Sequence, residues 1–156
     1  MICERLKKFL DEKGIAYTVI RHSEAFTAQE IAAAMHVHGK ELVKVIIVKS
    51  GDRYYMCALP ASYRADMGKL KDVLDVKDLR LATEEEFSNL FPDCEVGAIP
   101  PFGNLYKMDT HMDRVITENK EIVFQAGNHT EAIKMRYSDY AELVRPIVVD
   151  FAVKLH

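Results

Sequence analysis

The sequence lacks the patterns that mark several large classes of protein. No apolar run approaches the length of a membrane span, and the charged, amphipathic residues 1–8 contain no apolar core of a signal peptide. There is no glycine-rich phosphate-binding loop, and no serine or cysteine lies in a nucleophile-elbow pattern. These absences favour a cytoplasmic protein and exclude the commonest motifs of nucleotide hydrolysis and of covalent catalysis.

Cysteine is scarce, and charge is nearly balanced. Cys3, Cys57 and Cys94 lie far apart, form no CxxC pair and are odd in number. This argues for free thiols in a reducing compartment and against a disulfide framework or a zinc site. Of the six histidines, His36 and His38 would converge only in an extended segment, and His22, His111 and His129 have no ligand-like spacing, so the sequence predicts no metal site. We expect no other cofactor. A formal net charge of −3 excludes a global basic field, although a protein that grips only the end of a nucleic acid keeps such a balance.

What is present fits one ordinary domain. The 156 residues are 49% hydrophobic and 29% charged, which is enough to bury a proper core. Hydrophobic periodicity and capping patterns predict helices over residues 2–13, 27–39, 66–74, 83–91 and 138–144, and strands over residues 15–20, 42–49, 54–59, 79–82, 105–108, 121–126 and 132–135. Residues 110–120 are ambiguous and fit one helical turn. Because hairpins alternate with helices, we expect a single mixed α/β (α+β) domain on a twisted, mostly antiparallel sheet.

The end of the chain forms a separate apolar segment. Residues 147–153 follow Arg145-Pro146 and are too few for a domain. We therefore expect the domain to occupy residues 1–146 and residues 147–156 to be a tail. Two alternatives stay open for the tail: an added edge strand, or a segment that packs on a partner, such as a second copy in a dimer.

One charged residue is out of place. Lys44 shares a strand face with Leu42, Ile46 and Val48, where an ammonium group is costly unless it is paired. It is either a lysine whose stem reaches water at the start of a strand, or a cation held near a cleft for a phosphate, carbonyl or carboxylate.

Two glycine-containing loops have sequences that fit either a structural turn or a ligand-binding loop. Residues 97–103 read Gly-Ala-Ile-Pro-Pro-Phe-Gly, a stiff segment that is neither helix nor central strand. Its Phe102 has to pack on the core or on a ligand. Residues 127–130 read Gly-Asn-His-Thr between two strands, and form either a hairpin turn or a cradle of backbone N–H groups for an oxyanion.

Five segments stand in a fixed order along the chain: His22 with Phe26-Thr27-Ala28, Val43-Lys44-Val45, Pro60-Ala61, residues 97–103, and Gly127. Together they resemble the YbaK-type aminoacyl-tRNA deacylases, over roughly residues 1–145. The same kind of domain occurs in, or associated with, bacterial prolyl-tRNA synthetases. The resemblance implies a partly barrel-like sheet surrounded by helices. It also implies metal-independent hydrolysis of the ester of mischarged tRNA, with Cys-, Ala- or Ser-tRNA, charged on tRNA(Pro), as the expected substrates.

The resemblance also implies roles for particular residues. Lys44 and Gly127 fall on the family's catalytic positions, Lys44 contacting the terminal nucleotide or the aminoacyl group. The expected substrate-binding residues are His22, Thr27, Gly97, Ile99, Pro100, Pro101, Phe102, Gly103, Asn128 and His129. No general base is needed, because the ester is already activated and a ribose hydroxyl or the substrate's own side chain can direct the attack. Thr27 also has a structural role as a helix N-cap.

The expected partners follow from this function. They are the acceptor end of aminoacyl-tRNA and a prolyl-tRNA synthetase, with no membrane. Two other functions fit the same residues: a non-catalytic module that binds a nucleotide or an aminoacyl ligand, and a regulatory partner of a synthetase. The Asn128-His129 pair and the apolar tail depart from the family pattern and leave the substrate and the oligomeric state open.

Overall fold

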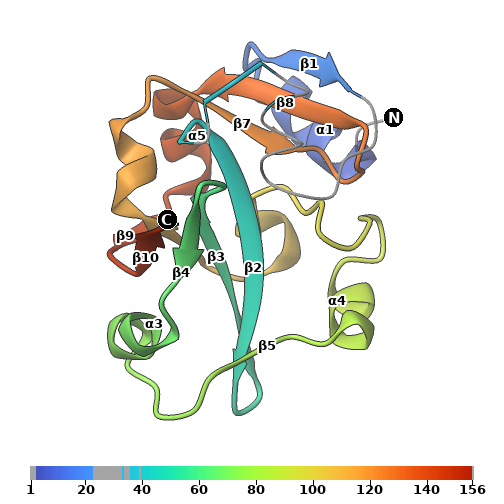
Figure 1. Cartoon of the computed structure of the whole chain (residues 1–156). Coiled ribbons are helices and arrows are strands. Elements are labelled where there is room, and N and C mark those ends of the chain that lie inside the picture. The colour runs from blue at the N-terminus through green and yellow to red at the C-terminus, as the bar shows by residue number, and fades with distance from the viewer. Residues whose placement is uncertain (1–2, 23–32, 34–35, 39, 156) are drawn as a thin grey trace.

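The computed structural model describes residues 3–22, 33, 36–38 and 40–155. Its main sheet has the strand order β1-β8-β7-β2-β3-β6-β9, with β5 added to β2 (Figure 1). These strands are β1 (Thr18–Arg21), β2 (Leu42–Ser50), β3 (Arg53–Pro60), β5 (Arg80–Leu81), β6 (Thr110–Asp113), β7 (Glu121–Gln125), β8 (Glu131–Arg136) and β9 (Ile147–Val149). A second, two-stranded sheet pairs β4 (Tyr63–Ala65) with β10 (Ala152–Lys154).

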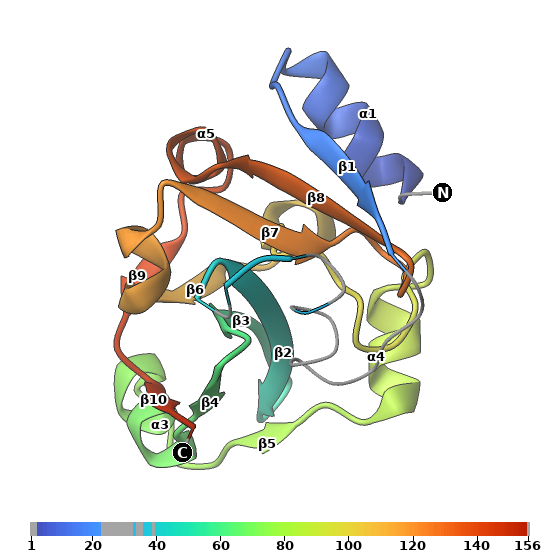
Figure 2. The same ribbon diagram turned by 45° about the horizontal axis from the view of Figure 1, so that its top comes forward.

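The sheet is mixed and strongly twisted. Its pairings are antiparallel except for β2 with β7, β3 with β6 and β6 with β9. In Figure 2 the β1–β8–β7 part crosses above the long β2–β3 hairpin, so the two parts of one sheet run in very different directions. The expected single mixed α/β domain with a mostly antiparallel, twisted sheet is therefore confirmed.

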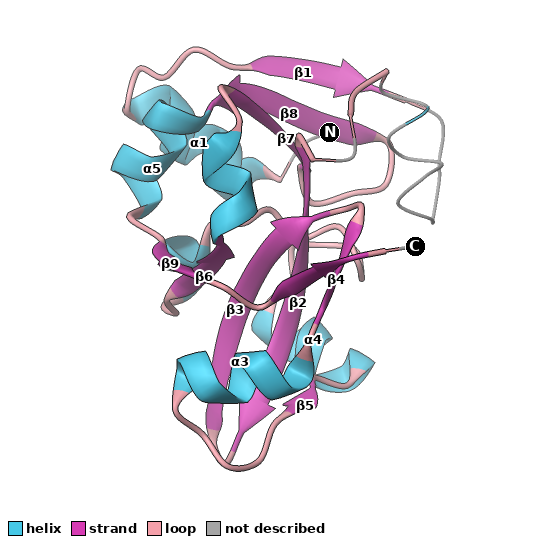
Figure 3. Ribbon diagram, turned by 60° about the vertical axis from the view of Figure 1, so that its left-hand side comes forward, coloured by secondary structure: helices cyan, strands magenta, loops and turns pink. Residues whose placement is uncertain are grey.

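Helices cover this sheet on several sides (Figure 3). Helices α1 (Glu4–Glu12) and α5 (Tyr137–Val144) share a core with β7 and β8, centred on the buried side chains of Leu6, Phe124 and Tyr140. Helix α3 (Met67–Leu74) packs through Leu70 on the β2–β3 hairpin, and α4 (Glu84–Leu90) approaches its other side. None of the described helices is long and apolar enough to cross a membrane.

The C-terminal segment is held inside the domain. Strand β9 pairs with β6, β10 pairs with β4, and the Phe151 side chain between them is fully buried. The buried carboxylate of Asp113 accepts hydrogen bonds from the backbone N–H groups of Phe151 (3.0 Å) and Ala152 (2.9 Å). Of the two alternatives for residues 147–153, the structure therefore has the added edge strand.

Some local predictions were wrong. Residues 105–108 are not a strand: Gly103–Tyr106 is a 3-10 helix, and the following Lys107 has a left-handed φ of +60°. The alternation of Leu105 and Lys107 suggested a strand, but a left-handed residue interrupts extended backbone. The ambiguous segment forms strand β6 followed by the 3-10 helix Arg114–Glu118. The predicted helix over 27–39 falls largely outside the described residues.

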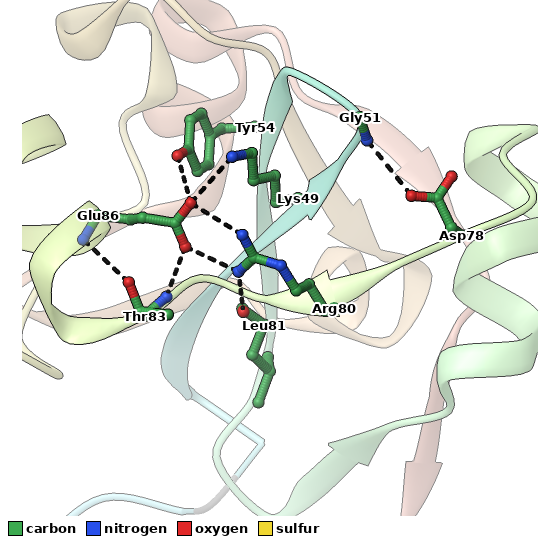
Figure 4. Close-up of polar contacts among 8 residues, drawn as sticks. All are labelled: Lys49, Gly51, Tyr54, Asp78, Arg80, Leu81, Thr83 and Glu86. Carbon is green, nitrogen blue, oxygen red and sulfur yellow. Dashed lines mark hydrogen bonds and ion pairs between the residues drawn. The ribbon is translucent and has the colours of Figure 1, made fainter.

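A charged cluster fastens α4 and β5 to the central hairpin (Figure 4). Glu86 accepts hydrogen bonds from Arg80 (2.7 and 3.0 Å), Tyr54 (2.6 Å) and Lys49 (3.1 Å). It also completes the predicted capping box with Thr83 at the start of α4. The cluster keeps β5 in place on the edge of β2.

Candidate functional site

The candidate site begins with the placement of Lys44 near the start of β2. Its register partner on β3 is Leu59, and along its own face of β2 it follows Leu42 and precedes Ile46. Leu42 and Ile46 belong to two different apolar clusters, so Lys44 lies where these clusters meet. The strand alternation inferred from the sequence is confirmed here.

The Lys44 ammonium is half-buried and makes no hydrogen bond or ion pair with any other residue that the structure describes. Desolvation lowers the pKa of Lys44 below its ordinary value of 10.5. A cation in this situation gains free energy from any anionic or carbonyl group that a ligand brings to it. Lys44 therefore has the properties expected of a binding residue.

Two polar residues continue from Lys44 across the sheet. Strand β7 runs parallel to β2 with Val43 opposite Phe124, so extending this register by one residue puts Gln125 level with Lys44 on the next strand. His22 follows β1, and its Nε2 lies 3.2 Å from the Gln125 amide. We call Lys44, Gln125 and His22 the polar row. It borders an apolar row on the same face, which consists of Leu42, Val123, Ala132 and Ile20.

Hydrogen bonds fix two members of the polar row, Gln125 and His22, at the end of β7. With its amide nitrogen toward His22, Gln125 donates to His22 Nε2 (3.2 Å) and to the carbonyls of Asn128 (3.3 Å) and Glu131 (3.2 Å). In this arrangement His22 Nε2 is the acceptor, and the imidazole proton lies on Nδ1. The His22 backbone N–H is held by the carbonyl of Thr130 at 2.9 Å.

Beside the polar row, the described strands leave part of one edge of β2 without a paired strand. Val123 N–H donates to Glu41 C=O and Ala82 N–H donates to Ile47 C=O, so the odd-numbered residues of β2 direct their backbone groups toward the edge shared by β7 and β5. The β7 pairing ends at Val43, and the β5 pairing begins at Val48. Among the described strands, none pairs with Val45 along this edge, and we call this interruption between the β7 and β5 pairings the gap.

The two glycine loops lie together. Gly127 N–H donates to the carbonyl of Ala98 (2.9 Å), and Glu95 N–H donates to the carbonyl of Gly127 (2.8 Å). His129 Nε2 bonds the carbonyl of Val96 at 2.7 Å, beside the exposed Gly97. Thus the structure brings Gly97, Gly127 and His129 into one place, although the sequence separates them.

The rest of the first loop belongs to the core. Phe102 is fully buried and makes ring contacts with Phe9, Phe124 and Tyr140, and the carbonyl of Pro101 accepts a hydrogen bond from the Tyr140 hydroxyl (2.5 Å). Ile99 packs with Ile47, on the face of β2 opposite to Lys44. Pro100 and Gly103 are buried as well. Of the two alternatives for Phe102, the structure shows packing on the core.

The second loop also differs from expectation. The N–H of Gly127 is already bonded to Ala98, so in this conformation it does not face a ligand as an oxyanion donor. The Asn128 Oδ1 accepts from the N–H groups of Thr130 (3.0 Å) and Glu131 (2.8 Å), which closes the turn between β7 and β8. Gly127 has φ of +99°, and a Cβ there would lie 2.8 Å from the Cβ of Cys3. Its absent side chain allows this close approach.

One contributor was not predicted from the sequence, and one expected residue lies outside the described residues. Gln125 was not singled out, because only the β2–β7 register places it level with Lys44. Val45 belonged to a segment that carried the resemblance, but no binding role was predicted for its N–H. Thr27 lies outside the described residues. A hollow of about 500 Å³ lies elsewhere, lined in part by Arg53, Lys107 and Arg145, and includes none of the expected site residues.

Comparisons with known proteins agree on one family. The sequence matches the aminoacyl-tRNA editing domain over residues 22–143. It is 26% identical over 153 residues to the multifunctional Ser/Thr-tRNA deacylase ProXp-y of Escherichia coli (strain K12), covering 95% of this chain and 91% of that protein. It is 31% identical over 77 residues to the proline–tRNA ligase of Geobacillus sp. (strain WCH70), covering 49% of this chain and 13% of the ligase. The crystal structure of a candidate trans-editing enzyme for prolyl-tRNA synthetase has a TM-score of 0.83 and 22% identity, covering 99% of this chain and 97% of that chain.

Proposed function

Because the chain belongs to the aminoacyl-tRNA editing domain family, we propose that it is a trans-editing deacylase, which hydrolyses the ester that joins a wrong amino acid to tRNA. The observation that supports this most is the half-buried Lys44 ammonium, which has no partner among the described residues and lies beside a stretch of β2 that no described strand pairs on that edge. The acceptor end of an aminoacyl-tRNA carries phosphate oxygens and an ester carbonyl, either of which can be the partner of the Lys44 ammonium.

The polar row and the unpaired stretch of β2 are proposed to bind different parts of the substrate. We assign to Lys44 the contact with the terminal phosphate or the ester carbonyl, and to the Val45 N–H a hydrogen bond to the substrate in the gap. His22 and Gln125 border the aminoacyl group, and Gly97 and His129 form the rim. Gly127 keeps the two loops together rather than donating its own N–H. The buried residues Ile99, Pro100, Pro101, Phe102 and Gly103 support the loop from the core side.

For this reaction the protein has mainly to position the ester and to stabilise the negative charge that develops on its carbonyl oxygen. Water adds to the ester carbonyl carbon, the carbonyl oxygen becomes an oxyanion, and the ester C–O bond then breaks to release the amino acid. The ribose oxygen leaves with a proton that originates from the water. Lys44 stabilises the negative charge that develops, while the neighbouring ribose hydroxyl or the substrate's side chain directs the water. No step in this scheme calls for a metal.

The substrate is expected to carry a small amino acid. ProXp-y is named for Ser- and Thr-tRNA, and a segment of this kind lies within proline–tRNA ligase. We therefore propose Ser-, Thr-, Ala- and Cys-tRNA as the substrates to compare, with tRNA(Pro) as the carrier and a prolyl-tRNA synthetase as a partner. A second pocket that removes wrong products exceeds the discrimination available from one small difference in a single pocket.

Hydrolysis of a defined panel tests the proposal. Ala-, Cys-, Ser- and Thr-tRNA(Pro) are incubated with the full chain beside correctly charged Pro-tRNA(Pro), and the remaining ester is measured over time. The wild type should deacylate at least one mischarged tRNA and spare Pro-tRNA(Pro). Lys44→Ala should fold and lose at least about a hundredfold in rate, as when an oxyanion-stabilising group is removed. Lys8→Ala, which removes an exposed lysine on α1, is the matched control.

The outcomes separate the alternatives. Normal hydrolysis by Lys44→Ala contradicts the role given to Lys44. Binding of the acceptor end without turnover of any ester favours the non-catalytic binding module. Turnover that appears only when a prolyl-tRNA synthetase is added places tRNA recognition in that partner.

A further inference from the structure

Two cysteines that are remote in sequence meet beneath the glycine loops. Cys3 is buried at the N-cap of α1, and Cys94 is half-buried in the segment that follows α4. Asp93 and Tyr106 join them, and we call these four residues the thiol cluster. The donor atoms of Cys3, Asp93 and Cys94 all lie within 4.8 Å of one another.

The separations within the thiol cluster are close to those in a metal's ligand shell. The Cys3 Sγ lies 3.1 Å from Asp93 Oδ2 and 3.8 Å from the Tyr106 hydroxyl. The Cys94 Sγ lies 3.2 Å from the same hydroxyl and 3.9 Å from Asp93 Oδ1. Zinc binds oxygen and sulfur at about 2.0–2.3 Å, so neighbouring donors in a tetrahedral shell lie roughly 3.3–3.8 Å apart. Small side-chain shifts are enough to convert the observed cluster into such a shell.

We propose that the thiol cluster is a structural binding site for a thiophilic divalent cation of the zinc class. Cys3, Cys94 and Asp93 supply two thiolates and a carboxylate, and Tyr106 occupies the fourth corner, where its hydroxyl or a water completes the shell. On binding, the two thiols release their protons to solvent and sulfur–metal bonds form, with no change of oxidation state. Thiolate ligands select zinc-like ions over magnesium or calcium.

Charge around the cluster is compatible with this occupant. Two thiolates, one carboxylate and a divalent cation carry a net charge of −1. The Arg5 guanidinium lies 3.3 Å from Asp93 Oδ2 and 4.7 Å from the centre of the Tyr106 ring, and offsets that charge. An outer partner of this kind orients a ligating carboxylate. Asp93 is 30% exposed, so the ion has a path from solvent.

The position of the cluster indicates what the ion does. Cys3 N–H donates to the carbonyl of Ala126 (2.7 Å), one residue before Gly127, and Cys94 directly precedes Glu95, whose N–H bonds Gly127. An ion here fastens the start of α1 and the segment before Gly97 to the same turn. It therefore braces both glycine loops from behind without touching Lys44, and its role is separate from the proposed chemistry.

Metal binding can be measured without any activity assay. The full chain is reduced, freed of metal and titrated with Co²⁺, then with Zn²⁺ in competition with a chromophoric chelator. We expect one ion per chain, a sulfur-to-cobalt charge-transfer band that Zn²⁺ abolishes, and a higher Tm with Zn²⁺ present. Cys94→Ser and Asp93→Asn should each weaken Zn²⁺ binding by at least about a hundredfold. Cys57→Ala, at the cysteine buried in another cluster, should bind normally.

Each remaining outcome overturns the proposal. Absence of the charge-transfer band in the reduced wild type shows that the cluster is only a network of hydrogen bonds. A band of undiminished intensity and an unchanged Zn²⁺ affinity in Cys94→Ser place the ion elsewhere. Asp93→Asn tests whether a loss of Zn²⁺ binding is due to misfolding. Asp93 is partly exposed and asparagine has nearly the same shape, so this variant should fold.

Discussion

The backbone N–H of Gly127 donates a hydrogen bond to the carbonyl of Ala98, with nitrogen and oxygen 2.9 Å apart. This bond joins the turn between β7 and β8 to the proline-containing loop, two segments that the sequence presents as unrelated. It also explains why Gly127 is needed for shape: its amide is already used, and its missing side chain leaves room for Cys3.

Gly127→Ala should therefore destabilise the fold. The new Cβ would lie 2.8 Å from the Cβ of Cys3, and alanine would be strained at φ of +99°. We expect a loss of at least about 2 kcal/mol in the free energy of unfolding, measured in urea, together with loss of hydrolysis. Gly51→Ala is the control, since it has φ of +57° with nothing within 4 Å and should cost only about 1 kcal/mol. Equal costs for both variants would contradict the close packing of Gly127 on Cys3.

Lys44→Met should stabilise the protein at neutral pH while abolishing activity. Burial lowers the pKa of Lys44 below 10.5, so the folded state holds this proton less tightly than the unfolded chain does. The resulting penalty is fully present below the lowered pKa and disappears as the pH rises toward 10.5. The stability difference between Lys44→Met and wild type should thus be largest at neutral pH and shrink in alkali. Lys8→Met should show no such trend, and a constant difference for Lys44→Met would argue against burial of the charge.

Variants of Phe102 can distinguish a role of its ring in the core from a role in binding the substrate. Its ring packs on Phe9, Phe124 and Tyr140 and is fully buried. Phe102→Ala should lower the free energy of unfolding by about 3–5 kcal/mol, and Phe102→Leu by clearly less. Deacylation by Phe102→Leu should stay close to wild type at a temperature where the variant is folded. A folded Phe102→Leu protein without activity would instead place this ring against the substrate.

Asp113→Ala should loosen the C-terminal segment. The variant leaves the buried N–H of Phe151 without its acceptor, together with those of Ala152 and Val115. We expect a loss of about 3 kcal/mol or more and faster amide hydrogen exchange in β10. Asp150→Ala removes an exposed ion pair with Arg114 and should change stability by less than about 1 kcal/mol. If residues 147–154 are mainly a docking segment for a partner, Asp113→Ala will change association and leave stability unaltered.

Glu86→Gln should reduce stability at neutral pH but not in acid. Arg80, then the Thr83 amide and the Tyr54 hydroxyl, hold the pKa of Glu86 far below its ordinary value of 4.5. The stabilisation is present above 4.5 and is lost progressively as the pH falls below it, because only the unfolded chain readily takes up the proton. Urea unfolding at pH 7 should separate wild type from Glu86→Gln, and the two should approach each other in acid. The exposed neighbour in Glu85→Gln should have little effect at either pH.

The sequence predicted those features of the fold that depend on residues close to one another along the chain. The β2–β3 hairpin, the helix over residues 66–74 and the capping box of α4 depend on contacts within a few positions, and all three are confirmed. Strand β6 was missed because its residues Thr110–Asp113 are polar in part and do not alternate. They are buried because β3 and β9 pair on either side, which a local pattern cannot reveal.

The same limit applies to the candidate site. The resemblance pointed to Lys44 and to both glycine loops, and the loops do lie side by side. The sequence did not show that the side chains of Ile99 and Phe102 point into the core, or that Gln125 lies level with Lys44. Those facts follow from strand register. Nor did the spacing of the cysteines show that Cys3 and Cys94 meet, since a separation along the chain does not limit contacts in the fold.

The parallel pairing of β2 with β7 has a kinetic consequence. Leu42 and Val123 lie far apart along the chain. Closing the long loop between them costs conformational entropy before the contact itself contributes, so such non-local contacts slow folding. The β2–β3 hairpin, by contrast, can form early from adjacent residues. We therefore expect the polar row to assemble late, with activity recovering after most of the helical signal during refolding.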